Sequence, residues 1–286
     1  MLYHLPAHTG YILHERARQF YGEGAGFLSI KSFFQGHALY TVGRVHYAAS
    51  DRSYLVLNHG RPYTISVEAE RPVESFCLFF APGFAEAVRR SLTTPADRML
   101  IEPEVSSPSS LRFFERTYPH DDLLSPALFQ LRAALARREP EQSWLIEQFH
   151  TIMQRLLQAQ TNVYKEVEAL PATRAATREE LYRRLHYARD YAAALFATPI
   201  SLNDMADVAG LSPNHLLRMF KQAFHQTPYQ YIIARRLAHA QELLNQTDQP
   251  VTEICFAVGF ESLGTFSWLF RRRVGVSPSA YRRQKR

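Results

Sequence analysis

The sequence predicts two domains: an N-terminal domain that is mainly β, a barrel or sandwich with flanking helices, and an all-α C-terminal domain with two helix-turn-helix units joined by a long helix. Three observations lead to this prediction. The length of 286 residues suits about two domains with their own cores. Short segments of alternating polarity fill the first part of the chain. A pattern of about 30 residues occurs twice near the C-terminus.

The composition excludes several classes of protein. A hydrophobic fraction of 46% and a charged fraction of 21% are those of an ordinary soluble globular chain. Cys77 and Cys255 stand far apart, which excludes a disulfide framework and a C-x-x-C site. The N-terminal stretch has no apolar signal core, and no run approaches about 18 apolar residues. We therefore expect a cytoplasmic protein with neither a signal peptide nor a membrane span.

The strand signals lie over residues of about 10–82, where we expect the barrel. YTISVE at 63–68 alternates apolar and polar residues, and SFCLFF at 75–80 is an apolar run suited to a buried strand. LVLNHGRPYTI at 55–65 has the pattern of two strands around a turn. Several short strands with turns between them indicate a small antiparallel barrel or sandwich.

The barrel could hold a ligand, and the sequence leaves its nature open. Seven aromatic residues either line an apolar pocket or belong to the core, so no effector-binding residue is assigned. They are Tyr40, Tyr47, Tyr54, Tyr63, Phe76, Phe79 and Phe80. A metal-binding barrel needs clustered histidines, but His37, His46 and His59 are scattered and no H-x-H occurs. We expect neither a metal nor a cofactor.

Helices are expected over about 83–165, followed by a linker at 168–177. Within the stretch 141–160, four large apolar residues recur at spacings of four, three and four. They are Leu145, Phe149, Ile152 and Leu156. Such a seam suits a helix pair between two subunits. The alternative is that it packs against the chain's own barrel.

The C-terminal pattern is a duplicated unit. Leu202, Ala206, Gly210 and Leu211 align with Val251, Cys255, Gly259 and Phe260 at an offset of 49. One extra residue then enters the second copy. Leu216, Phe220, Pro228 and Tyr231 align with Phe266, Phe270, Pro278 and Tyr281 at an offset of 50. Two copies are too few for a solenoid and indicate a repeated supersecondary unit.

Each copy has the signals of two helices around a tight turn. In the first copy, Ser201 and Asp204 form an S-x-x-D capping pattern, and Gly210 supplies the positive φ that ends a two-turn helix. Ser212-Pro213 starts the next helix, with serine as N-cap and proline at the first helical position. One copy alone is a weak signal, but two copies in register predict two helix-turn-helix units.

The stretch 178–286 resembles the DNA-binding domain of the AraC/XylS family of bacterial transcription regulators. The resemblance is carried by the turn from Met205 to Gly210, by LSPNHLLRMFK at 211–221, and by VTEICFAVGF at 251–260 through FRRRVGVSPSAYRR at 270–283. It covers somewhat over a third of the chain. It implies two helix-turn-helix units on one connecting helix, RNA polymerase as a partner, and a cupin-like effector-sensing and dimerising domain over 1–167.

The connecting helix is also predicted without the family. Thr227-Pro228 is a good helix start, and 231–245 contains no proline or glycine. About 18 residues at 1.5 Å each give a rod of roughly 27 Å. This length is comparable to the roughly 34 Å between successive major-groove segments on one face of DNA. One chain is therefore expected to contact two adjacent segments of an asymmetric site.

Exposed positions on the second helix of each unit are the candidates for base contacts, because such a helix enters the major groove. They are Asn214, His215, Leu217 and Arg218 in the first unit, and Leu263, Gly264, Thr265, Ser267 and Trp268 in the second. Arg218 stands where the family commonly has a base-contacting arginine. Trp268 is its counterpart and cannot make a bidentate guanine contact. The alternative for Trp268 is a core or interdomain aromatic.

Charge is concentrated in the same region. Residues 178–286 hold 15 Lys and Arg against 9 Asp and Glu, a net of +6, whereas 1–177 hold 18 of each. A basic excess beside helical signals favours a polyanionic partner. Phosphate contacts, or plain surface charges, are expected at Lys221, Arg235, Arg236, Arg271, Arg272, Arg282 and Arg283.

Together these patterns predict a sequence-specific regulator of transcription that binds double-stranded DNA and is not an enzyme. We expect an activator that forms a homodimer and can be controlled by a small molecule in its N-terminal domain. A repressor and a ligand-independent architectural DNA binder are the alternatives. An enzyme fused to a DNA-binding domain is less favoured, because the first half lacks a catalytic cluster.

Overall fold

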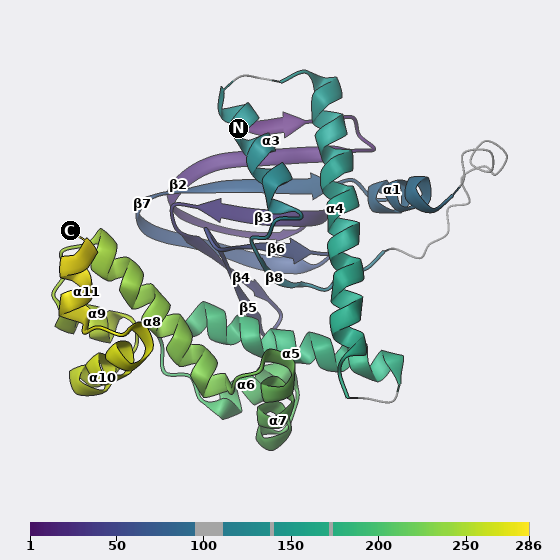
Figure 1. Cartoon of the computed structure of the whole chain (residues 1–286). Coiled ribbons are helices and arrows are strands. Elements are labelled where there is room, and N and C mark those ends of the chain that lie inside the picture. The colour runs from purple at the N-terminus through teal and green to yellow at the C-terminus, as the bar shows by residue number, and fades with distance from the viewer. Residues whose placement is uncertain (95–110, 138–139, 172–173, 286) are drawn as a thin grey trace. The chain divides into compact units, whose positions relative to one another are not determined.

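The computed structural model describes residues 1–94, 111–137, 140–171 and 174–285 (Figure 1). The chain divides into two compact units, Met1–Arg183 and Arg184–Arg286. The predicted linker at 168–177 includes residues 172–173, which lie outside the described residues. Among the described residues, no helix is both long enough and apolar enough to cross a membrane.

The first unit is built on an eight-stranded antiparallel sheet that closes into a barrel (Figure 1). The strands are β1 (Leu2–His4), β2 (Gly10–Ala25), β3 (Leu28–Phe34), β4 (His37–Val42), β5 (Val45–Ser50), β6 (Ser53–Leu57), β7 (Pro62–Phe80) and β8 (Arg116–Pro119). Seven of them follow the order β1-β2-β7-β3-β6-β5-β4, β7 pairs with β4 as well, and β8 pairs with β6. The predicted β-rich barrel is therefore present in this unit.

The 19-residue strand β7 closes the barrel. Its first half pairs with β4, where Ser66 faces Leu39, and its second half pairs with β3, where Phe80 faces Leu28. The other edge of β7 pairs along nearly its full length with β2, interrupted by an irregularity between Ala17 and Gln19. The predicted turn within LVLNHGRPYTI lies between β6 and β7, and Gly60 there has φ of 73°. Strand β7 therefore joins β2, on one of its edges, to β3 and β4 on the other.

Three described helices lie wholly within the first unit beside the barrel. They are α1 (Phe84–Thr93), α3 (Ser125–Arg137) and α4 (Gln142–Glu168). Helix α4 carries the four residues of the predicted dimer seam, Leu145, Phe149, Ile152 and Leu156, and the chain itself buries all four. The ring centroid of Phe149 lies 5.3 Å from that of Phe80 at the end of β7.

The interpretation of this seam as a contact between subunits is therefore wrong, and its alternative is confirmed. A second aromatic contact places Phe149 beside Phe84 of α1, at 6.5 Å between ring centroids. A helical period of apolar residues indicates that one face is buried, but it does not indicate what covers that face. Here Phe149 is covered by Phe80 of β7 and Phe84 of α1, from the same chain.

A buried carboxylate ties α3 to the barrel. The Glu74 side chain on β7 is only 1% exposed. Arg132 of α3 donates to it through Nε at 2.6 Å and Nη2 at 3.1 Å, and Arg16 of β2 donates through Nη2 at 2.9 Å. His14 Nε2 lies 2.9 Å from Glu74 Oε1. Hydrogen bonds from Arg132, then from His14 and Arg16, hold the pKa of Glu74 at about 2 despite its burial.

Glu74→Gln is expected to lower the free energy of unfolding by about 3 kcal/mol, because it leaves Arg132 without its charged partner. The folded pKa lies below the usual value of 4.5. The wild-type contribution is therefore complete above about pH 4.5 and is lost as the pH falls toward 2. Urea unfolding at pH 7 and pH 3 measures both effects. Glu68→Gln, at an exposed position of the same strand, is the control and should change little. Equal stability of the two variants would contradict the account.

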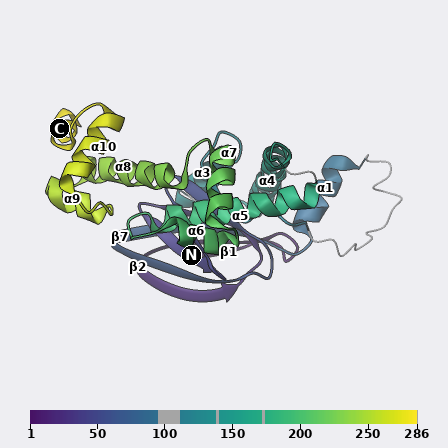
Figure 2. The ribbon, with the colours of Figure 1, turned by 90° about the horizontal axis from the view of Figure 1, so that it is seen from below.

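The second unit is entirely helical. It contains the C-terminal part of α5 (Ala175–Leu195), then α6 (Leu202–Ala209), α7 (Pro213–Phe224), α8 (Pro228–Gln246), α9 (Val251–Ala257), α10 (Leu263–Val274) and α11 (Pro278–Lys285). The helix starts reproduce the sequence offsets: α9 follows α6 by 49 residues, and α10 follows α7 by 50. Helices α6 and α7 lie at one end of α8, and α9 and α10 lie at the other (Figure 2).

Local signals explain these helix ends. Ser201 and Asp204 form the predicted capping box of α6, with Ser201 N donating to Asp204 Oδ2 at 2.8 Å. Gly210 ends α6 with φ of 60°. Ser212 caps α7, and proline occupies its first position. In the second copy Gly259 again has a positive φ, of 91°, and Ser262 caps α10. The glycine turn and the serine cap of the second helix therefore recur in both pairs, whereas α9 begins after Pro250 without a side-chain cap.

Helix α8 holds both pairs. One core cluster joins it to α9 and α10 through Ile233, Leu237, Ala240, Leu244, Ile254, Cys255, Val258, Phe260, Phe266 and Phe270. Toward its other end, the ring centroids of Tyr231 and of Phe220 on α7 lie 5.9 Å apart. Arg236 of α8 donates to the carbonyl oxygens of Phe196 at 2.7 Å and Thr198 at 3.1 Å. Helix α8 therefore packs against α7 toward one end and against α9 and α10 toward the other.

Candidate nucleic-acid interface

Helix α7 presents one exposed polar face. Asn214, Leu217, Arg218 and Lys221 are exposed, while Leu216, Met219 and Phe220 are buried. The exposed set is spaced by three, one and three residues, so its side chains share one side of the helix. His215 is half-buried. Amide, guanidinium and ammonium groups are thus available to a ligand along two turns of α7.

Helix α10 repeats this arrangement 50 positions later. Leu263, Gly264, Thr265, Trp268 and Arg271 are exposed, and Ser267 is half-buried. Phe266 and Phe270 are completely buried, in positions equivalent to Leu216 and Phe220. Every base-contact candidate therefore lies outside the core. Whether each one contacts a base stays a prediction.

Trp268 is not a core residue of this unit, since it is 58% exposed. The Arg272 guanidinium lies 5.1 Å from the centroid of its ring, as in a cation–π contact. The core alternative for Trp268 is therefore wrong. Trp268 of α10 is equivalent to Arg218 of α7. Its exposed indole offers an apolar surface, and the neighbouring Arg272 adds a positive charge.

The candidates for phosphate contacts divide into two groups. Lys221, Arg271, Arg272 and Arg283 are exposed, and Arg235 is half-buried. Arg236 and Arg282 both donate to backbone carbonyls, Arg282 to that of Gln249 at 2.5 Å. These two side chains hold neighbouring segments together, so the four exposed residues are the better candidates for phosphate. The distinction depends on folded contacts that sequence spacing does not reveal.

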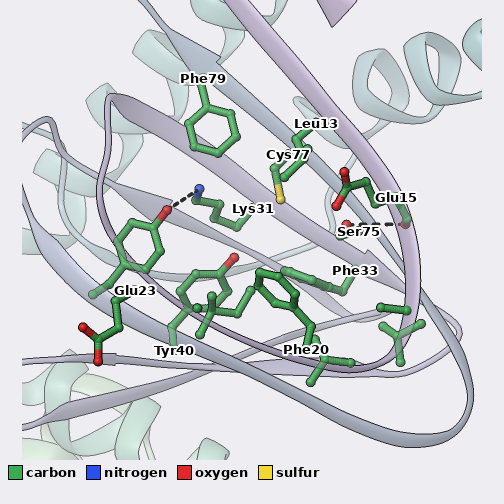
Figure 3. Close-up of a pocket in the computed structure, with 16 residues that line it drawn as sticks. Leu13, Glu15, Phe20, Glu23, Lys31, Phe33, Tyr40, Ser75, Cys77 and Phe79 are labelled. Carbon is green, nitrogen blue, oxygen red and sulfur yellow. Dashed lines mark hydrogen bonds between the residues drawn. The ribbon is translucent and has the colours of Figure 1, made fainter. Parts of the chain in front are cut away.

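The barrel encloses a second candidate site, a cavity of about 150 Å³ (Figure 3). Its lining comes from β2, β3, β4 and β7. Three of the seven predicted aromatic residues line it, namely Tyr40, Tyr63 and Phe79. The other four, Tyr47, Tyr54, Phe76 and Phe80, are core residues outside the lining.

Sequence reasoning missed Lys31, which also lines this cavity. Its signal is a lysine inside the otherwise apolar or small stretch LSIKSFF at 28–34, all of which is buried. Lysine is almost never fully buried unless its charge is paired. Among the described residues, no group of three or more His, Cys, Asp or Glu side chains could hold a metal ion.

Comparison with known proteins finds relatives of the C-terminal unit. The helix-turn-helix domain family model matches residues 205–284. The regulatory protein SoxS of Salmonella typhimurium is 39% identical over 84 residues, which cover 29% of this chain and 78% of SoxS. The probable transcriptional regulator LumQ of Photobacterium leiognathi is 23% identical over 243 residues, 81% of this chain and 93% of LumQ.

Among solved structures, the DNA-binding domain of the global transcriptional factor AdpA, in complex with a target DNA, is 30% identical. The match covers 35% of this chain and 91% of that chain, with a TM-score of 0.34. The duplicated helix pairs and the matching domain model define a helix-turn-helix DNA-binding protein. With SoxS as a relative over most of its length, the chain belongs to the AraC/XylS family of transcription regulators.

Proposed function

We propose that this regulator binds an asymmetric DNA site by placing α7 and α10 in two adjacent major-groove segments. The observation that supports this proposal is the equivalence of the two exposed faces, with Asn214, Arg218 and Lys221 on one helix and Gly264, Trp268 and Arg271 on the other. Helix α8, of 19 residues, is about 28 Å long. This is close to the roughly 34 Å that separates successive segments on one face of DNA.

The effect on transcription and its control are also part of the proposal. We expect activation through contact with RNA polymerase, as the family resemblance implies, and a small-molecule effector in the barrel. The cavity favours an effector over a purely architectural role, because a ligand-independent barrel would be filled by its own side chains. The protein is expected to work in the cytoplasm.

A homodimer remains part of this proposal, without the seam on α4 as its interface. Sedimentation velocity of the full chain at micromolar concentration measures the oligomeric state. A monomer on DNA would leave the two helix pairs of one chain as the whole DNA-binding surface.

DNA binding by the full chain is expected to be sequence-specific and strongly salt-dependent. A site enriched from a random duplex pool should be preferred over a scrambled duplex of the same composition. If about six to ten phosphates are contacted, affinity should fall by about 10³ to 10⁵ between 50 and 200 mM salt. Fluorescence anisotropy over a salt series measures both quantities. The proposed function would be contradicted if no sequence were enriched from the pool, or if the affinity did not change with salt concentration.

A further inference from the structure

The Lys31 side chain lies inside the barrel cavity without a charged partner. It is 1% exposed, and its ammonium points toward Phe79 (Figure 3). Lys31 Nζ donates to the Tyr63 hydroxyl at 3.4 Å and lies 3.6 Å from the centroid of the Phe79 ring. Among the described residues, no carboxylate is within ion-pair distance of this nitrogen.

A buried ammonium in this position is costly unless an anion accompanies it. Burial lowers the pKa of Lys31 to about 8, so the side chain is still mostly protonated at neutral pH. The tyrosine and cysteine side chains around it carry no negative charge at that pH. Burial raises the pKa values of Tyr63 and Cys77 on β7, Tyr40 on β4 and Tyr11 on β2. The barrel therefore holds one unneutralised positive charge within an apolar cavity.

We propose that this cavity is the effector site and that it binds a small apolar monocarboxylate, with the carboxylate on Lys31 Nζ and the Tyr63 hydroxyl. The inference rests on the proposed control of this regulator by a small molecule. The remaining lining supplies the apolar contacts, chiefly Leu13, Phe33, Ile65 and Phe79. An entering carboxylate replaces the missing partner of Lys31 with a charge-assisted hydrogen bond, the strong type in a dry site.

Size and charge limit the ligand. A cavity of about 150 Å³ matches the volume that accommodates a benzene ring in another protein. Glu15 and Glu23 also line the cavity, and both are exposed. Figure 3 shows the Glu15 carboxylate on the side of Cys77 and the Glu23 carboxylate turned away from Lys31. The Glu15 carboxylate acts on Cys77 inside the cavity and therefore disfavours a second negative charge on the ligand. The preferred ligands are therefore monoanions with a body of about one ring or a short chain.

Calorimetry on the full chain tests the charge requirement with matched probes. Hexanoate and phenylacetate are compared at pH 7 with hexanamide and phenylacetamide, which keep the shape without the charge. Each carboxylate is expected to bind at least tenfold more tightly than its amide, and adipate, with a second carboxylate, less tightly than hexanoate. Lys31→Met should abolish the preference for carboxylates, while Lys165→Met, at the exposed lysine of α4, should retain it.

The wild-type pH dependence is a second test that requires no variant. The anion binds the protonated lysine, so affinity should be nearly constant below about pH 7 and fall as the pH rises through 8. The expected loss is about tenfold between pH 7 and pH 9.

Several outcomes would overturn the assignment. They are equal affinity for acid and amide, no binding by any carboxylate at millimolar concentration, or unchanged carboxylate binding in Lys31→Met. Trapping of hexanal on Lys31 by borohydride without carboxylate binding would instead make the lysine a carbonyl-binding nucleophile. Fluorescence anisotropy with DNA on the same samples distinguishes the ligand inference from the proposed DNA-binding function. Specific DNA binding without carboxylate binding would contradict only the ligand inference.

Discussion

Arg218→Ala is expected to weaken binding to the specific DNA site by about 1–3 kcal/mol, roughly tenfold to more than a hundredfold. Arg218 is exposed in the middle of the face that α7 presents, between Asn214 and Lys221. A guanidinium there can donate to O6 and N7 of one guanine, and alanine can donate to neither. The loss should be confined to one or two base pairs, where the variant should accept all four bases about equally.

The matched control is Arg283→Ala, an exposed arginine on α11. A phosphate contact carries no base information, so this variant should weaken all duplexes about equally. The slope of log affinity against log salt should also fall by about one contact. Anisotropy over a panel of single base-pair substitutions distinguishes the two patterns. If Arg218→Ala also weakens every duplex by the same factor, Arg218 contacts the backbone and the base-contact assignment is wrong.

Gly259→Ala is expected to destabilise the C-terminal unit by about 3 kcal/mol or more and to abolish specific DNA binding. Gly259 ends the first helix of the second pair with φ of 91°, in a region that side chains rarely adopt. An added Cβ would lie 2.5 Å from the carbonyl oxygen of Ala197. Because that neighbour is backbone, relieving the overlap requires the segment before α6 to move away from α9.

The equivalent glycine of the first pair provides the control. Gly210 has φ of 60°, and a Cβ there would meet only the flexible end of Arg184, at 3.7 Å. Gly210→Ala should therefore cost only about 1 kcal/mol, the conformational term by itself. Thermal unfolding of both full-length variants measures the difference. Equal stability of the two variants would show that the close approach of Gly259 to Ala197 does not exist in solution.

The C-terminal unit was largely predictable because its signals are local. Serine caps mark where α6, α7 and α10 begin, and positive-φ glycines mark where α6 and α9 end. The helix starts repeat at offsets of 49 and 50 residues. Each of these features depends on only a few neighbouring residues, and the duplicated sequence contains most of them twice. The sequence also placed Asn214 and Arg218 correctly on an exposed face of their helix.

The first unit was less predictable because its contacts join distant segments. Phe149 was correctly expected to be buried, but its partners on β7 and α1 follow only from the closed barrel. The hydrogen bond from Arg132 to Glu74 joins residues that are 58 positions apart, and no local sequence pattern predicts it. Lys31 was overlooked because alternation assigns a lysine to the solvent side, whereas β3 is buried along its whole length.

Hydroxyl-radical footprinting of the full chain on its selected site tests the central claim most directly. If α7 and α10 occupy adjacent major-groove segments, protection should appear in two patches on one face of the duplex, about 10 base pairs apart. Arg218→Ala should weaken one patch more than the other. One protected patch of a single groove segment, unchanged in register by substitutions on α10, would contradict the account.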